Sequence, residues 1–518
     1  MRASNRVARA AGIIVITSLL SRVLGFVREQ IMAAKFGLSG VTDAYFAAFT
    51  IPDILYTLLV GGALSSAFIP VFSSYLHQEN EKEAWKFASI AINLVTLTMV
   101  IATILGWIYA PYLLPLVAYK LPLQYRELAI ELTRIIFPSV IFTAFNGLQM
   151  GILHSYKHFH TPAYGSLLYN IGIIGTGLLL SPWLGIKGFS YGVVVGVFLS
   201  FLIQVPALVQ HGLTKYYVFS FNLLHPGIRR TVRLMTPVVL AMSVNQINLV
   251  INQNFASSLD PGTISALRLA NRLMMLPLGV FGAAIAVALF PNLNELVARG
   301  ENKAFKEAVI FGLRATFFIN IPAAVGLIAL GVPIVRLLFE HGVFTHEQTL
   351  RTASILSFYA LGIFAQAGLQ MVMRGFYALH DTLTPLTFGL VTVALNYFLN
   401  ATLIHSLGAE GLALAYTLTG MFDFITLLFL FRRKVGPLGL KSLVTATVKI
   451  VAVSAVMGIS VWFIASLFEF LSVQRLAVQL AQVTTAVVLG VGLYLAFSMF
   501  LKMPEARFVL EAVGRRFR

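Results

Sequence analysis

The sequence predicts an all-α integral membrane protein with about fourteen transmembrane helices. Three observations support this fold class. Of the 518 residues, 58% are hydrophobic and only 11% are charged, whereas a soluble domain carries roughly 25% charged residues. Apolar runs of about 20 residues, long enough to cross a bilayer, follow one another along the whole chain. Similar motifs also recur about 220 residues apart, which indicates an internal duplication.

The first apolar run begins after Arg2, Arg6 and Arg9, an arrangement that also occurs in signal peptides. No small-residue cleavage site follows, so we expect a permanent span. Short connections separate this span from the others. The expected spans are residues 9–34, 44–75, 85–112, 127–153, 163–182, 188–212, 229–256, 264–298, 305–330, 352–377, 384–405, 411–432, 444–468 and 477–501.

The duplication assigns these spans to two copies and an appendage. Gly147-Leu-Gln-Met150 recurs as Gly368-Leu-Gln-Met371, 221 residues later, and Gly185-x-x-Gly188 recurs as Gly408-x-x-Gly411 at an offset of 223. We predict a six-helix lobe at 1–222, a second at 223–435, and two extra transmembrane helices with a cytoplasmic tail at 436–518. Six spans per copy make the repeats parallel, with a cleft between the lobes as the expected translocation site.

The net charge of +17 has two interpretations, nucleic-acid binding or the positive-inside rule. When the connections are numbered from a cytoplasmic N-terminus, most of the lysines and arginines fall on the inner side, including Arg432, Arg433 and Lys434. The outer connections hold far fewer. This asymmetry predicts that both termini are cytoplasmic, and it accounts for the basic excess without nucleic acid.

Four arginines within predicted spans are the strongest functional candidates: Arg22, Arg28, Arg268 and Arg272. Each stays charged when buried, and one at mid-membrane costs at least about 2.5–3.5 kcal/mol. None has a counterpart in the other copy, where the equivalent positions are Ser243, Leu249, Ala47 and Ile51. Residues needed only to build two similar bundles tend to appear in both, so we assign these arginines to a ligand.

Helical rise places the arginines at a similar depth. Arg22 lies about 10 Å and Arg272 about 12 Å below the outer face. Arg268 and Arg272 are four residues apart on one helical face. Arg22 shares a face with Glu29, and Arg28 shares one with Ser21. Several arginines at one depth form a site for phosphate or pyrophosphate, which guanidinium binds in bidentate fashion.

Arg28 has an alternative interpretation. It lies next to Glu29 and near Asp43 in the sequence. Pairing with one of these carboxylates at the outer interface, or snorkelling toward it, would account for its charge without a ligand.

A second set of polar residues lies in the eleventh and twelfth spans. Asn396, Asn400 and Asp423 carry oxygens that suit Na⁺, and Asp423 is also a candidate proton carrier. The alternative is hydrogen bonding between helices, which is the commoner use of amides in membranes. We therefore keep a cation site and a structural role both open, and we expect no bound cofactor.

Motifs for an enzyme or a nucleotide-driven pump are absent from the sequence. It contains no G-x-x-x-x-G-K-[ST] motif and no G-x-G-x-x-G motif after a strand. Membrane enzymes that act on polyprenyl diphosphates use carboxylate clusters to hold Mg²⁺, and no Asp-rich cluster occurs here. These absences favour a transporter.

Several segments resemble one transporter family. Ser21-Arg-Val-Leu-Gly-Phe-Val-Arg-Glu29, with Thr42-Asp-Ala-Tyr-Phe46, resembles the N-terminal signature of the MurJ/MviN lipid II flippases, which belong to the MOP transporter superfamily. The segments from Asn271 to Val280, Val335 to Phe344 and Tyr377 to Pro385 resemble further signatures of that family. The resemblance extends from the first span to the eleventh.

The resemblance implies export of the lipid-linked peptidoglycan precursor across the bacterial cytoplasmic membrane by alternating access. It implies that Arg22, Arg28 and Arg272 face the central cavity near Asp43, and that the last two spans guide the polyprenyl tail. The expected drive is the membrane potential or a Na⁺ or H⁺ gradient, and the expected partners are lipid II, membrane lipids and cell-wall synthesis proteins. Tyr56-Thr57 stands where many relatives carry an arginine pair, so either part of their phosphate clamp is missing here or Arg268 replaces it.

Three other functions remain as alternatives: a flippase for another polyprenyl-linked glycan, a MATE-like exporter, and a membrane polyprenyl-phosphate enzyme. MATE pumps handle cationic drugs, which a cavity of several arginines would repel. Mg²⁺-dependent turnover of lipid II by the pure protein would support the enzyme.

Overall fold

The computed structural model describes residues 2–58, 67–78, 80–468 and 475–506, and within them it contains helices and no strands. The chain divides into two compact units, residues 1–264 and 265–518. The sequence places its lobe boundary earlier, at 222/223, so α11 lies with the first unit in the structure although the duplication assigns it to the second copy. The all-α membrane class is confirmed.

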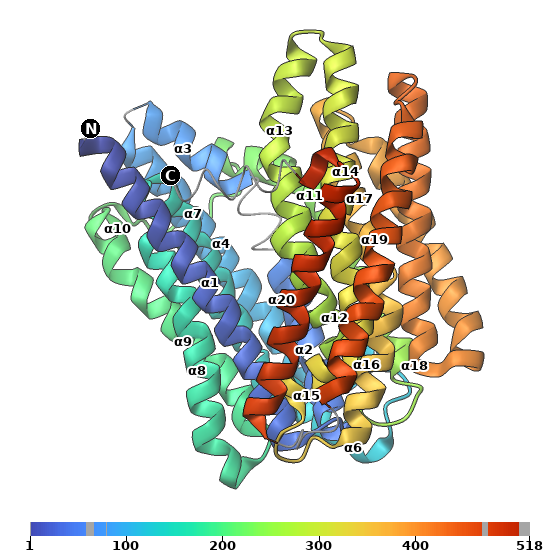
Figure 1. Ribbon diagram of the computed structural model, residues 1–518. Coiled ribbons are helices and arrows are strands. Elements are labelled where there is room, and N and C mark those ends of the chain that lie inside the picture. Colours follow the sequence, from blue (N-terminus) through green and yellow to red (C-terminus); the bar gives the residue numbers. More distant parts are fainter. Residues whose placement is uncertain (1, 59–66, 79, 469–474, 507–518) are drawn as a thin grey trace. The chain divides into compact units, whose positions relative to one another are not determined.

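The first unit contains the helices α1 to α11 (Figure 1). Their bounds are α1 Arg2–Phe36, α2 Gly40–Tyr56, α3 Ile69–His77, α4 Glu81–Ile108, α5 Ala110–Val117, α6 Leu123–Ile136, α7 Ser139–Ser155, α8 His160–Leu184, α9 Lys187–Gln210, α10 Leu213–Tyr216 and α11 Pro226–Ala256.

The second unit begins within the first turn of α12 and continues past α20. Its elements are α12 Thr263–Pro277, the π-helical turn η2 Leu278–Gly282, α13 Ala283–Ala298, α14 Asn302–Ala329, α15 Gly331–Phe339, α16 His346–Ala360, α17 Ile363–Ala378, α18 Leu383–Val435, α19 Leu440–Leu467 and α20 Leu476–Phe500. The last twelve residues of the predicted cytoplasmic tail lie outside the described residues.

Within the described residues, eight helices are long and apolar enough to cross a membrane, or ten if each of two bent helix pairs is one span. The 53-residue α18 bends at Gly408, where φ is 57°. At about 1.5 Å per residue a straight helix of this length would far exceed the 30 Å hydrocarbon core, so α18 reads as two spans. The total of fourteen stays a prediction.

The duplication predicted from sequence motifs is visible in the helices. The short helices α5 and α15 each follow a 28-residue helix, α4 and α14, and those two helices start 221 residues apart. The pair α6–α7 bends by 40° and the pair α16–α17 by 41°. π-helical backbone starts at Thr57 in the first copy and at Leu278 in the second, again 221 residues apart.

The repeated glycine motif has one backbone conformation in both copies. Gly185 has φ 56° and ψ −136°, and Gly408 has φ 57° and ψ −126°, values that a residue with a Cβ rarely adopts. The third residue after each also packs tightly. A Cβ on Gly188 would lie 2.9 Å from the nitrogen of Ser181, and one on Gly411 would lie 2.3 Å from the oxygen of Leu403. The motif therefore reverses the chain between two closely packed helices.

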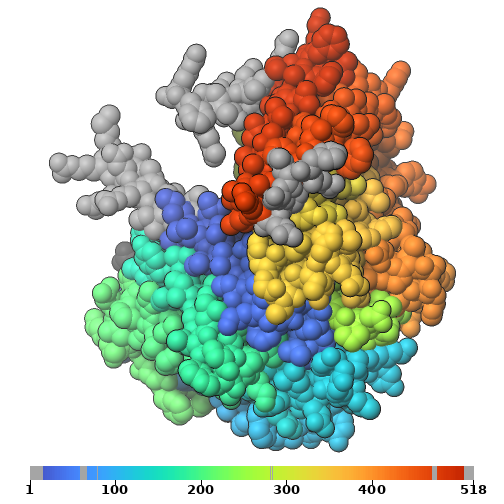
Figure 2. Space-filling model, turned by 60° about the horizontal axis from the view of Figure 1, so that its bottom comes forward, coloured from blue at the N-terminus to red at the C-terminus, as the bar shows by residue number. Residues whose placement is uncertain are grey.

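Small residues bring α8 and α9 into close contact. A Cβ on Gly172 would lie 2.5 Å from the Cα of Gly196, and a Cβ on Gly196 would lie 2.4 Å from the carbonyl oxygen of Tyr169. The side chains of these two helices form one continuous surface in Figure 2. Backbone approach of this kind is how helices pack in lipid, where apolar burial between helices gains little.

The segment that connects α9 to α11 is held along α4. The indole nitrogen of Trp85 donates to the carbonyl of His211 at 2.9 Å, and Val218 N–H donates to Ser89 Oγ at 3.1 Å. Asn93 Nδ2 donates to the carbonyl of Ser220 at 3.1 Å, and its Oδ1 accepts from Tyr217 at 2.6 Å. Trp85, Ser89 and Asn93 are four residues apart, so one face of α4 carries all three.

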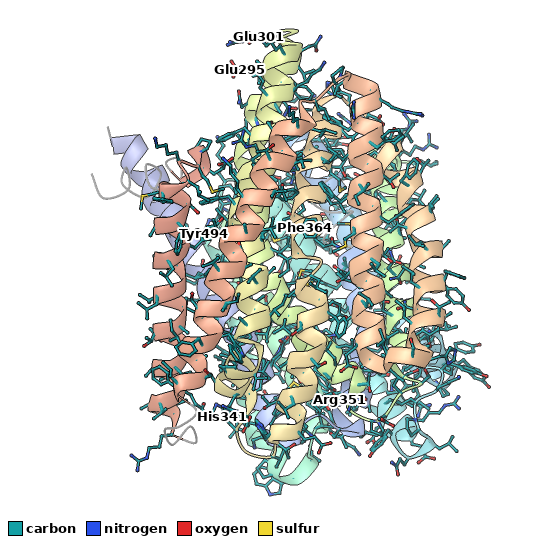
Figure 3. All side chains as sticks on the ribbon, turned by 45° about the vertical axis from the view of Figure 1, so that its right-hand side comes forward. Glu295, Glu301, His341, Arg351, Phe364 and Tyr494 are labelled. Atoms are coloured by element: carbon teal, nitrogen blue, oxygen red, sulfur yellow. The ribbon has the colours of Figure 1, made fainter. Side chains whose placement is uncertain are left out.

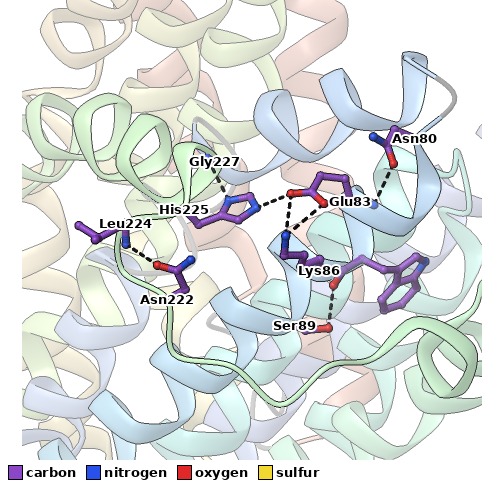
Figure 4. A network of polar contacts seen from close by, with 9 residues as sticks. Asn80, Glu83, Lys86, Ser89, Asn222, Leu224, His225 and Gly227 are labelled. Atoms are coloured by element: carbon purple, nitrogen blue, oxygen red, sulfur yellow. Dashed lines mark hydrogen bonds and ion pairs between the residues drawn. The ribbon is translucent and has the colours of Figure 1, made fainter.

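This strap, residues 211–225, ends at a hydrogen bond to the Glu83 carboxylate near the start of α4. His225 is buried, and its Nε2 lies 3.0 Å from Glu83 Oε1, while Nδ1 accepts from Gly227 N–H at 3.1 Å (Figure 4). Lys86 lies 3.3 Å from the same oxygen of Glu83. The charged end fixes where α11 begins relative to α4.

In the second unit, α14 is the central helix. It packs against α13, α17 and α19, and Tyr494 on α20 donates to the carbonyl of Phe318 at 2.7 Å. Figure 3 shows Glu295 and Glu301 at one end of this unit, and His341 and Arg351 at the opposite end. These are the ends that the charge pattern assigns to the inner and outer sides.

Candidate functional site

Arg28 lies among aromatic residues and one carboxylate in the first unit. Its Nη2 is 3.7 Å from Oε1 of the buried Glu29, and the exposed fraction of the Arg28 side chain is 16%. The Tyr169 hydroxyl of α8 accepts a hydrogen bond from the guanidinium, and Tyr45 of α2 lies nearby. The carboxylate pairing that we considered for Arg28 is therefore present, but Tyr169 holds the same guanidinium from another helix.

Ser21 connects α1 to α8. Its hydroxyl donates to the carbonyl of Ser166 at 3.1 Å, and Asn170 Nδ2 donates to the Ser21 hydroxyl and to its carbonyl oxygen at 3.2 Å each. Ser21 lies two turns before Arg28, and Asn170 follows Tyr169. The α1–α8 contact therefore fixes the register in which Tyr169 meets Arg28.

Asp43 is buried, and its carboxylate accepts a hydrogen bond from the backbone of a distant loop. Its Oδ2 accepts a hydrogen bond from Gly262 N–H at 2.7 Å. Gly262 has φ +90°, and a Cβ there would lie 2.8 Å from the backbone of Leu38. The carboxylate thus joins the start of α2 to the loop after α11, a structural use of a residue that the sequence assigned to the substrate site.

Arg22 is exposed on α1, six residues before Arg28. The helix is continuous across both arginines, since it extends from Arg2 to Phe36. Six residues correspond to about 9 Å along a helix axis. Helix α1 therefore carries an accessible guanidinium at Arg22 and, at Arg28, one that its neighbours hold in place.

Arg268 and Arg272 lie in the second unit, on α12. Arg272 is exposed and Arg268 is half-buried. Both lie on the uninterrupted part of the helix, before Pro277 and the π-helical turn at Leu278–Gly282. Four residues of separation put the two side chains on one face, as the sequence predicts.

The candidate cation residues gather around α18. Asn396 and Asn400 are both buried, and Asn400 Nδ2 donates to Asn396 Oδ1 at 3.0 Å. The hydroxyl of Thr392 is hydrogen-bonded to Asp423, on the other side of the Gly408 bend. Thr392, Asn396 and Asn400 are spaced by four, so Asp423 meets the face that carries both amides. Helix-to-helix bonding and oxygen ligation are both compatible with this arrangement.

Sequence reasoning missed Tyr169, Tyr45 and Gly262. The two tyrosines come from helices other than α1, which carries Arg28, and an apolar sequence with 18 tyrosines gives no signal for which one meets a charge. The Ser-Ser-Leu-Asp-Pro-Gly stretch around Gly262 does indicate a turn. It does not indicate that this turn donates to Asp43.

Comparison with solved structures defines the class of protein. A multidrug resistance MATE family transporter of the MOP superfamily, in an inward-facing conformation, matches 82% of this chain and 98% of its own with a TM-score of 0.67, at 17% identity. At that identity the likeness concerns the fold alone, and it shows that the chain shares the helical architecture of this MOP-superfamily protein.

The family follows from closer matches. The family model described as lipid II flippase MurJ matches residues 32–493. The lipid II flippase MurJ of Burkholderia cenocepacia is 31% identical over 81% of this chain and 82% of its own. The probable lipid II flippase MurJ of Vibrio cholerae is 30% identical over 96% and 97%. A structure of lipid II flippase MurJ in an inward closed conformation covers 94% and 98%, with a TM-score of 0.79 at 30% identity. The chain belongs to the MurJ lipid II flippase family.

Family membership confirms the resemblance noted in the sequence. It also confirms that the chain is a multi-span membrane transporter of this family rather than an enzyme.

Proposed function

We propose that this protein moves lipid II, the undecaprenyl-diphosphate-linked peptidoglycan precursor, from the inner to the outer leaflet of the bacterial cytoplasmic membrane. The observation that carries the proposal is the family match over residues 32–493, together with relatives named as lipid II flippases that align over most of both chains. The polar headgroup cannot cross hydrocarbon without a protein that replaces its water.

We assign the pyrophosphate of the substrate to Arg22, Arg28 and Arg272, with Arg268 as a further contact. Guanidinium groups stay charged and bind phosphate oxygens in pairs, which suits a diphosphate in a low-dielectric cavity. Arg22 and Arg272 are exposed side chains within the predicted spans 9–34 and 264–298, and an intramembrane charge is functional by default. Ser21, Glu29 and Asp43 support the site indirectly. Ser21 joins α1 to α8, Glu29 pairs with Arg28, and Asp43 joins the start of α2 to the loop after α11.

Transport proceeds by alternating access between the two lobes, 1–222 and 223–435, with the helices of 436–518 guiding the polyprenyl tail. The drive is the membrane potential or a cation gradient, for which Asp423 with Asn396 and Asn400 is the candidate coupling site. The MOP fold, shared with MATE transporters, supports coupled transport.

Both termini lie in the cytoplasm, as the positive-inside pattern favours, and cell-wall synthesis proteins are the expected protein partners.

The test is depletion and complementation in a bacterium whose own flippase is under conditional control. Depletion leaves lipid II on the inner leaflet, and expression of this chain is expected to restore the pool that is accessible from outside. An unchanged external pool on expression of membrane-inserted protein would refute the proposal. Restoration of a different polyprenyl-linked glycan alone would favour the runner-up substrate.

A further inference from the structure

A pocket of about 560 Å³ lies in the second unit, apart from the arginines of α12. Its walls are α14, the first three turns of α19 and the residues that follow α20. The residues that matter for its chemistry are Arg314, Lys441, Thr445, Lys449 and Glu505. We call it the α14–α19 pocket.

An ion pair forms one wall of the α14–α19 pocket. Nε of Arg314 donates to Oε1 of Glu505 at 2.6 Å, and Nη2 contacts the same oxygen. The Glu505 side chain is 3% exposed and Arg314 is 24% exposed. The pair ties the segment after α20 to α14, and it neutralises both charges.

Two lysines supply the remaining charge of the pocket. Lys441 and Lys449 are exposed on α19, with Thr445 midway between them. The one carboxylate among the lining residues, that of Glu505, is already paired with Arg314. Since the Arg314–Glu505 pair sums to zero, the described lining residues carry a net charge of about +2 and favour a phosphate.

Exposed apolar side chains lie beside the lysines, on a neighbouring stripe of α19. Val444, Val448 and Val451 are 60%, 63% and 47% exposed, and their spacing of four and three puts them on one face. The helix is apolar enough to cross a membrane. A free anion would make no use of these valines, whereas an acyl chain attached to a phosphate would lie along them.

We propose that the α14–α19 pocket binds the phosphate of an anionic glycerophospholipid, with Lys441 and Lys449 as its cationic contacts and its acyl chains along Val444, Val448 and Val451. Basic pockets between transmembrane helices at the cytoplasmic interface recognise such headgroups. The bound lipid joins α14 and α19, and it occupies a site separate from the arginines assigned to the transported substrate.

The test counts lipids retained by the purified full-length protein in native mass spectrometry. Phosphatidylglycerol and phosphatidylcholine are added in separate arms. The K441Q/K449Q double variant is expected to bind phosphatidylglycerol about thirtyfold more weakly than the wild type, since each lysine near an anionic lipid contributes a factor of about five. The K303Q/R432Q variant removes two exposed cations elsewhere on the same unit and is expected to bind like the wild type.

Equal affinity for both lipids, or equal loss in the two double variants, would overturn the proposal. Displacement of phosphatidylglycerol by millimolar inorganic phosphate would show a simple anion site instead. Competition by lipid II that depends on Lys441 and Lys449 would show a substrate site. Either result contradicts a glycerophospholipid pocket.

A positional measurement guards against a variant that changes lipid retention indirectly. The chain has no cysteine, so V448C can carry a single fluorescent label. Brominated phosphatidylglycerol is expected to quench this label more than brominated phosphatidylcholine, and K441Q/K449Q is expected to abolish the difference. A label at I459C, further along the exposed face of α19, is expected to be quenched equally by both. Equal quenching at Val448 would contradict the proposal.

Discussion

At the residue scale, the structure distinguishes two kinds of arginine in the first unit. Arg28 is held by Tyr169 and Glu29, whereas Arg22 is exposed. A guanidinium fixed by a tyrosine loses little conformational freedom when it binds a phosphate. We therefore interpret Tyr169 as the residue that positions Arg28 for the substrate.

Replacement of Tyr169 by phenylalanine removes the hydroxyl and keeps the ring. A hydrogen bond to a charged group contributes about 1.5–3 kcal/mol, so lipid II affinity is expected to fall about ten- to a hundredfold in Y169F. Binding of lipid II to the purified protein measures this. Tyr164 is an exposed tyrosine on the same helix, and Y164F is the matched control. Wild-type affinity in Y169F would show that Arg28 needs no positioning partner.

Asp381 lies outside the predicted spans, and its carboxyl makes the stability of the protein depend on pH. Burial acts to raise the pKa of this carboxyl, but hydrogen bonds from Lys434 and from Thr384 outweigh it and lower the pKa to about 2, below its usual value of about 3.9. The ionised Asp381 carboxylate therefore stabilises the folded state fully above about pH 4, and this contribution is lost as the pH falls through about 2. D381N is expected to melt below the wild type at pH 6, and the difference should shrink toward pH 2.5. A difference that grows on acidification would contradict this assignment.

Much of the site at this scale was predictable, because charge in an apolar segment is conspicuous. Arg22, Arg28, Arg268 and Arg272 stood out by their cost and by their absence from the other copy. Their partners did not stand out, since a tyrosine or a backbone N–H is compatible with any membrane helix. The contact of Asp43 with Gly262 joins residues 219 positions apart, and no local pattern encodes it.

At the element scale, close helix packing depends on glycines with defined neighbours. A Cβ on Gly172 would lie 2.5 Å from Gly196, whereas one on Gly175 of the same helix meets nothing within 4 Å. G172A is expected to destabilise the protein by about 1–3 kcal/mol through overpacking. G175A is expected to be neutral, or to stabilise it by up to about 1 kcal/mol through helix propensity. Thermal unfolding in detergent measures both, and equal effects would refute the close α8–α9 contact.

A second feature at this scale is the strap, residues 211–225, which is held along α4 by hydrogen bonds. Asn93 bonds Ser220 and Tyr217 through its two side-chain atoms. N93A is expected to speed amide hydrogen exchange of residues 217–220 about tenfold, since each hydrogen bond contributes about 1 kcal/mol. Thr98 bonds only the carbonyl of Leu94 in its own helix, so T98A is the control. Unchanged exchange in N93A would mean that the strap is held elsewhere.

The helices were largely predictable from the sequence, whereas the bends within the predicted spans were not. Recurring glycine motifs indicated the duplication, and Gly185 and Gly408 indeed share one conformation. The bent pairs α6–α7 and α16–α17 correspond to the predicted spans 127–153 and 352–377, and the prediction contained no bend in either. The first bends beside Pro138 and the second beside Gly362, so two different sequences give the same bend. Hydrophobic periodicity carries no information on such a break.

At the scale of the whole molecule, the helical scaffold is duplicated and the arginines assigned to the substrate are not. Chemistry-bearing arginines occur once per chain, while the helices that carry them occur twice. A duplicated scaffold with unduplicated charges is how a near-symmetric bundle acquires a site with one orientation. That asymmetry suits a substrate with one polar head and one apolar tail.

The central claim is that arginines on α1 and α12 bind the diphosphate of lipid II during its translocation. The most direct measurement is the externally accessible lipid II pool in a flippase-depleted bacterium that expresses wild type, R22A, R272A or R299A at equal levels. Arg299 is an exposed arginine outside the site, so R299A is expected to match the wild type. R22A and R272A are expected to leave lipid II inside. Full restoration of the external pool by R22A and R272A would contradict the account.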